Sequence, residues 1–277
     1  EETDIQALIE RYENMLLSGK KAYFDADEFE VLADYYLSID DSEYAEAVID
    51  EGLRIHPDHQ SLIILKAKVL NILEFFEESL SLIESISDEG DPDLSLIKVE
   101  AYISLNRIQE GNDLINKTIA SNLSIEELYT FITELGFIMN DNSYFERAIY
   151  FLEQSLKIDN SNNDVLIELS FANEMILNYD KAIEYTNILL DMNPYSYDGW
   201  VSLGKLYSLN EQYDKAVDAF DFASTINDGD VTALKMKALS LFLNDNTAEA
   251  LKTFKECILL NPDDEHTYDS IIEGYET

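Results

Sequence analysis

Three histidines, one cysteine and several clusters of carboxylates are the side chains in this sequence that could bind a metal or take part in catalysis. His56 and His59 flank Pro57, with no cysteine beside them. Because a zinc site needs three or four converging ligands, we expect both histidines to be solvated turn residues. We therefore predict no metal site and no cofactor.

The acidic clusters lack the spacing of a known cation site. A calcium loop places its ligands at alternate positions and closes with a glutamate. None of the dense acidic segments, residues 25–28, 88–93 and 227–230, has that pattern, although weak adventitious calcium binding stays open. The chain also lacks a glycine-rich phosphate loop and a nucleophile elbow. We therefore predict no catalytic residues, and a protein that is not an enzyme.

The composition is strongly acidic, with 57 acidic and 18 basic residues and a net charge of −39. Nucleic acids and anionic membrane surfaces both need a basic face, so we expect neither as a partner. The charge would speed encounter with a basic protein, or it serves only solubility. The chain contains 4 Pro and 9 Gly, few enough for long helices. Its four arginines and abundant Ile, Asn, Tyr and Phe suit an AT-rich, bacterial genome.

The sequence shows no apolar run long enough to cross a bilayer and no secretory signal. We therefore expect a cytoplasmic protein. The chain begins at Glu1 instead of a methionine, which leaves open a leader removed by processing or trimming.

Residues at a fixed spacing of 34 reveal an internal repeat. Three series of residues follow this spacing. Two of them consist of small residues: Ala148, Ala182, Ala216 and Ala250; and Gly136, Ser170, Gly204 and Ala238. The third consists of residues that end helices: Asn160, Pro194, Asp228 and Pro262. Towards the N-terminus, the repeat position of Gly136 is held by Ala33, Ala67 and Val99. The steps between these three residues are 34 and 32, and the step from Val99 to Gly136 is 37. The longer step indicates extra residues near 122–126.

The best-preserved repeat explains why small residues recur. Trp200, Leu203, Gly204 and Tyr207 share one helical face, and Ala216 and Phe220 resume the pattern after a break at residues 210–212. Two antiparallel helices approach closely only where a side chain is small. This run resembles the tetratricopeptide (TPR) motif, from which it departs at Asp228, where the motif has proline.

The resemblance implies an all-α, right-handed superhelical solenoid of antiparallel helix pairs. We predict an N-terminal capping helix within residues 1–25, seven TPR-like hairpins over residues 26–262, and a C-terminal helix over residues 263–277 that continues the register. The predicted hairpins start at these residues: Ala26, Gln60, Pro92, Tyr129, Asn163, Tyr197 and Val231. The last segment is either a natural cap, which solenoids need, or the start of a trimmed repeat.

In the family, the first helices of the repeats line a concave groove, so the resemblance also implies a set of partner-binding residues. Transferred to this sequence, that set is Phe137, Ile167, Phe171, Met175, Val201 and Lys205. These side chains form an apolar stripe beside one lysine, with acidic rims at Asp164, Glu174 and Asp198. The alternative is that neighbouring repeats cover them. No repeat carries the Lys and Asn pair of the TPR proteins that clamp a terminal carboxylate.

These features favour a non-enzymatic scaffold or adaptor that binds a protein or peptide segment, basic or amphipathic, in its groove. Two alternatives stay open. One is a structural subunit of a larger assembly, and the other is a regulatory sensor of a peptide or small molecule. Cys257 stands at the repeat position that Ala223 holds one repeat earlier, so we expect a small buried side chain there.

The net charge of −39 predicts that salt stabilises the fold, because self-repulsion weakens a compact, highly charged chain. The Debye length shortens to about 8 Å near physiological ionic strength. The melting temperature, followed by circular dichroism, should therefore rise by several degrees between low and moderate sodium chloride. Choline chloride should act equally, since the effect is screening. An unchanged melting temperature would contradict this electrostatic argument.

Overall fold

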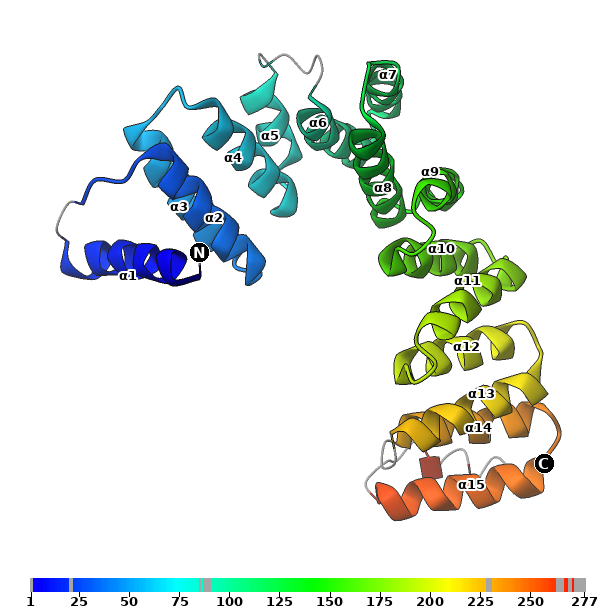
Figure 1. Cartoon of the computed structure of the whole chain (residues 1–277). Helices are drawn as coiled ribbons and strands as arrows, with labels where there is room; N and C mark the ends of the chain where they lie inside the picture. The colour runs from blue at the N-terminus through cyan, green and yellow to red at the C-terminus, as the bar shows by residue number, and fades with distance from the viewer. Residues whose placement is uncertain are drawn as a thin grey trace. The chain divides into compact units, whose positions relative to one another are not determined.

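A computed structural model describes residues 2–19, 22–84, 86, 91–227, 231–262, 267, 268 and 271. Within these residues the chain forms fifteen α-helices and no strand (Figure 1), which confirms the all-α prediction. The helices are α1 (Glu2–Ser18), α2 (Ala26–Ser38), α3 (Ser42–Ile55), α4 (Gln60–Ile72), α5 (Phe76–Ile83), α6 (Pro92–Ser104), α7 (Ile108–Ile119), α8 (Ile125–Asp141), α9 (Phe145–Ile158), α10 (Asn163–Met175), α11 (Tyr179–Met192), α12 (Tyr197–Leu209), α13 (Tyr213–Ile226), α14 (Val231–Leu243) and α15 (Thr247–Leu260).

The chain divides into two compact units, Glu1–Phe131 and Ile132–Thr277, and the division falls inside α8. Helices pair in chain order within each unit: α2 with α3, α4 with α5 and α6 with α7 in the first, and α10 with α11, α12 with α13 and α14 with α15 in the second. In the first unit α1 adds its own apolar face, because Ile9 and Tyr12 are buried against Phe24 and Phe29. No helix of the described residues is long and apolar enough to cross a membrane.

The turn inside each pair has one conformation throughout the chain. Its central residue has a positive φ of 57–64° although none of these residues is glycine: Asp40, Glu74, Asn106, Ser143, Leu177, Glu211 and Asp245. The next residue donates its N–H to the carbonyl five positions back at 2.7–2.9 Å, as Gln212 does to Tyr207. This is the Schellman motif, which satisfies carbonyls that the helix end leaves open. Its steps of 34, 32, 37, 34, 34 and 34 residues repeat the spacing of the small residues in the sequence.

The small residues lie where paired helices touch, as the sequence pattern predicts. A methyl group added at Gly204 would lie 2.6 Å from the ring of Phe220 on α13, and one added at Gly136 would overlap Leu152 on α9. In other pairs a serine hydroxyl bridges the contact: Ser79 Oγ donates to the Ala67 carbonyl at 2.9 Å. Helix pairs in both units are therefore held at a separation that larger side chains would not permit.

Six of the seven predicted first helices begin at the predicted residue, and the exception is α8. It begins at Ile125 instead of Tyr129, so the extra residues near 122–126 add a helical turn. Ser124 and Glu127 cap this turn reciprocally, at 3.2 and 2.7 Å. Cys257 is buried, as expected. The predicted C-terminal helix over residues 263–277 lies largely outside the described residues.

The positive φ of Leu177 predicts a stabilising substitution. A left-handed conformation costs an ordinary side chain about 1 kcal/mol, whereas asparagine adopts it readily. Leu177 is 70% exposed, so its replacement sacrifices little burial. Leu177→Asn should therefore raise the melting temperature by about 3 °C, as measured by circular dichroism.

Leu177→Ala is the matched control, because alanine removes the exposed side chain but keeps the conformational cost. It should give little or no gain. An alanine variant as stable as the asparagine variant would mean that turn conformation is not the cause.

Candidate functional site

The second unit contains a groove between α10, α11 and α12, with a volume of about 570 Å³. It lies between two first helices and the second helix that joins them. The residues that line it are Asn163, Ile167, Ser170, Phe171, Glu174, Thr186, Leu189, Leu190, Asn193, Ser196, Asp198, Gly199, Ser202, Lys205 and Leu206.

One wall of the groove is apolar and accessible. Ile167 and Phe171 are four residues apart on α10, so they share a face, and they are 50% and 43% exposed. The ring of Phe171 meets Phe145 edge to face at 5.9 Å, which fixes its orientation. Leu189 and Leu206 extend the apolar lining from α11 and α12. A ligand that covers this wall would remove exposed apolar surface from water, which favours binding.

The polar side chains of the groove fall into two groups. Ser170 is already engaged, because its hydroxyl lies 2.8 Å from that of Thr186 and 3.2 Å from the Ala182 carbonyl. Lys205, by contrast, is exposed and forms no ion pair with any described residue. Glu174 and Asp198 line the same groove. The groove therefore offers one available cation and two carboxylates beside an apolar wall.

Two small residues belong to the α12 side of the groove. Gly199 and Ser202 line the groove. The equivalent positions hold Val165 and Glu168 one repeat earlier, and Ala233 and Met236 one repeat later. Even a methyl group at Gly199 would lie 2.8 Å from Leu190 Cδ2. Gly199 is therefore a close contact with α11, whereas Ser202 is smaller than the residues that both neighbouring repeats place at its position.

The structure brings together three of the six residues predicted for partner binding. Ile167, Phe171 and Lys205 line the groove. Phe137 is half-buried on α8, and Met175 is exposed at the end of α10, but neither is a lining residue. Val201 is 7% exposed and packs with Phe220 in the core, so it offers little surface to a partner.

Sequence reasoning missed the contribution of α11 to the groove. It assigned the groove to first helices alone, whereas Thr186, Leu189, Leu190 and Asn193 come from a second helix. Ser202 was the available signal, because the aligned positions hold the larger residues Glu168 and Met236.

Two buried tyrosines have raised pKa values. Burial raises the pKa of Tyr12 to about 12 and, with Tyr44 and then Glu51 as smaller causes, keeps that phenol protonated. Burial, then the neighbouring Glu153, raises the pKa of Tyr185 above its usual range, and its hydroxyl donates to Glu153 at 3.1 Å. Neither phenol lines the groove; Tyr12 packs against Phe24 and Phe29, and Tyr185 is buried.

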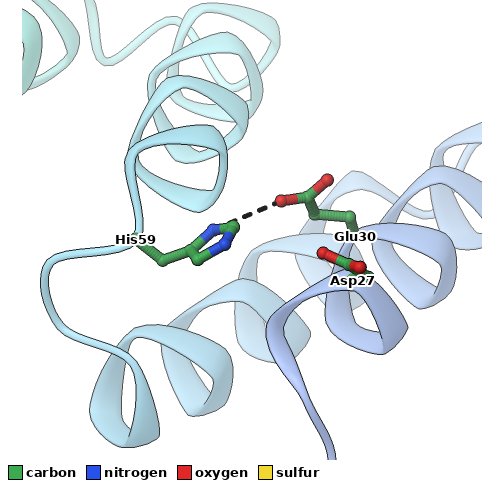
Figure 2. Close-up of side chains that lie close together, drawn as sticks. All are labelled: Asp27, Glu30 and His59. Atoms are coloured by element: carbon green, nitrogen blue, oxygen red, sulfur yellow. Dashed lines mark ion pairs between the residues drawn. The ribbon is translucent and has the colours of Figure 1, made fainter.

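The histidines of the first unit lie in the turn between α3 and α4, as expected, but both are only partly exposed and have neighbours that the sequence analysis did not anticipate. His56 is half-buried, and its Nε2 lies 3.0 Å from the carbonyl oxygen of Phe24. His59 Nδ1 lies 3.4 Å from Glu30 Oε1 on α2, and Asp27 joins this pair in one cluster (Figure 2). Folding thus brings to His59 two carboxylates of α2 that lie far from it in the sequence.

No model of a known protein family matches the chain. A curated relative, a TPR repeat-containing protein of Methanocaldococcus jannaschii, is 24% identical over 251 residues, which cover 85% of this chain and 40% of the relative. This chain therefore corresponds to well under half of that relative's length.

Two solved structures share the architecture. One is the C-terminal part of a TPR repeat-containing protein from Cytophaga hutchinsonii, with a TM-score of 0.64 and 14% identity over 87% of this chain and 98% of that one. The other is YrrB, described as a TPR protein with an unusual peptide-binding site, with a TM-score of 0.50 and 15% identity over 70% of this chain and 96% of that one. The helix pairs of this chain therefore have the fold of tetratricopeptide repeats, in an all-α helical solenoid.

Proposed function

We propose that this chain is a non-enzymatic interaction scaffold that holds an amphipathic peptide segment in the groove between α10, α11 and α12. The observation that carries the proposal is the accessible apolar wall of Ile167 and Phe171 beside the unpaired Lys205. Recognition of a peptide by a groove between helices uses this combination of apolar anchors and a few oriented polar groups.

The groove chemistry specifies the kind of segment. Two apolar side chains of the peptide would cover Ile167 and Phe171, and hot spots of binding are expected at such packed anchors. Basic side chains would meet Glu174 and Asp198, and Lys205 would take a backbone carbonyl or a carboxylate of the peptide. The net charge of −39 would speed the encounter with a basic segment.

The peptide-binding site in the description of YrrB is a precedent in a protein of the same fold, and at 15% identity it supports no more than that. A small molecule is the second candidate, because a volume of about 570 Å³ lies within the usual range of small-molecule sites. A structural subunit of a larger assembly is the other alternative; the C-terminal segment, through which such a subunit would extend the array, lies largely outside the described residues.

Selection of a random peptide library on the immobilised full chain tests the proposal. We expect enriched peptides with two apolar residues flanked by basic ones. Ser202→Met should weaken their binding at least tenfold in fluorescence anisotropy, about 1.4 kcal/mol. The substitution places in the groove the side chain that Met236 carries one repeat later. Phe171→Ala should weaken binding similarly through loss of an anchor.

Leu259→Ser is the matched control. Leu259 is an 82% exposed apolar residue on α15 and does not line the groove, so its loss should change the affinity less than twofold. Equal affinity of the wild type, Ser202→Met and Phe171→Ala would show that peptides bind elsewhere. No enrichment, together with a groove-dependent small-molecule hit, would favour the second candidate.

A further inference from the structure

The cluster of Asp27, Glu30 and His59 in the first unit has the donor set and spacing of a metal site. Asp27 and Glu30 are three residues apart on α2, so both project from one face, and His59 immediately precedes α4. Figure 2 shows the three side chains turned towards one another from these two helices. One ligand atom of each residue lies within 4.8 Å of the other two.

The distance between two of these atoms fits tetrahedral coordination. His59 Nδ1 and Glu30 Oε1 are 3.4 Å apart, longer than a normal hydrogen bond. Two ligands each about 2.0–2.1 Å from a tetrahedral zinc ion lie about 3.4 Å from one another. Both atoms are shielded from solvent and make no hydrogen bond, although their side chains remain 37% and 30% exposed. Shielded polar atoms without a partner are rare, and each calls for an explanation.

His59 occupies a position at which other first helices have a capping side chain. Asp25, Asp91, Asn162 and Ser196 precede their helices in the same way, and each accepts a backbone N–H. His59 makes no such bond, and the first turn of α4 contains no acidic residue. The helix forgoes a stabilising cap, while the backbone of His59 is held by bonds to His56 and Ile63. The backbone bonds therefore hold His59 in place, while its imidazole ring takes no part in capping α4.

The neighbouring carboxylates have other partners. Asp25 and Glu28 form a capping box, with bonds of 3.1 and 2.9 Å. Glu28 also pairs with Arg11 at 2.6 Å. Of the four acids between residues 25 and 30, Asp27 and Glu30 are the two that turn to the imidazole.

We infer that Asp27, Glu30 and His59 bind a divalent transition-metal cation of the Zn²⁺ class, which clamps α2 to the start of α4. Imidazole nitrogen with carboxylate oxygen suits such ions, whereas Mg²⁺ and Ca²⁺ prefer oxygen ligands alone. Three protein ligands leave a fourth position for water. The two carboxylates balance the charge of the ion. This inference is independent of the groove, which lies in the other unit.

The test is a Zn²⁺ titration of the full-length, chelator-treated chain, read by isothermal calorimetry and by the imidazole signals in NMR. The chain has three histidines, so the signal lost in His59→Gln assigns His59. We expect Zn²⁺ to shift that signal, and His59→Gln and Glu30→Gln to weaken binding at least tenfold. Mg²⁺ in large excess should not displace Zn²⁺.

Asp27→Asn and Asp93→Asn form a matched pair, because both residues are exposed and hold the second position of a first helix. Asp27→Asn should weaken Zn²⁺ binding about tenfold at unchanged helicity, and Asp93→Asn should leave it within twofold. This pair keeps the inference testable if a substitution at His59 impairs folding. An unshifted His59 signal at saturating Zn²⁺, equal affinity across the variants, or displacement by Mg²⁺ would each overturn it and leave an ion pair between repeats.

Discussion

Each helix pair of this solenoid depends on close approach of its two helices at a small residue. The contact of Gly204 with Phe220 leaves no room for a methyl group, and the bond from Ser79 Oγ to the Ala67 carbonyl at 2.9 Å requires the same proximity. Since interiors pack at near-crystalline density, the pair cannot relax around a larger side chain. The Schellman turn then fixes the angle at which the second helix returns. Contact and turn recur together, and so the repeat length is nearly constant.

That coupling explains what the sequence could reveal. Small residues must recur wherever helices touch, so their regular spacing predicted the pairs and six of the seven first-helix starts. The start of α8 was misplaced because a capping pair, Ser124 and Glu127, adds a turn before the repeat begins. The groove was half predicted, since its α10 wall follows from repeat position. Its α11 wall could not be predicted in this way, because the space beside α11 depends on the small side chain of Ser202 on α12.

The acidity of the chain has structural as well as solvating roles. Asp25, Asp41 and Asp91 accept backbone N–H groups at helix starts, where carboxylates also suit the helix dipole. Asp180 and Asp214 accept amide bonds from Asn210 and Asn244 in the following repeat, at 3.0 and 2.7 Å. With 57 acids and 18 bases, however, most carboxylates have no cation to pair with. Many of them contribute solubility and mutual repulsion instead of stability.

Departures from the repeat are therefore more informative about function than the repeat itself. A repeat position usually holds a side chain that packs in the core or caps a helix. A residue that does neither lowers the stability of the fold unless another interaction compensates. Ser202 gives up the volume that Glu168 and Met236 occupy at its position in the neighbouring repeats, and it lines a groove with an accessible apolar wall. His59 gives up a helix cap, and its ring instead faces two carboxylates of the preceding repeat. Each departure leaves a stabilising interaction unmade at a point where side chains suited to binding a ligand lie close together. This pattern is expected where function competes with folding.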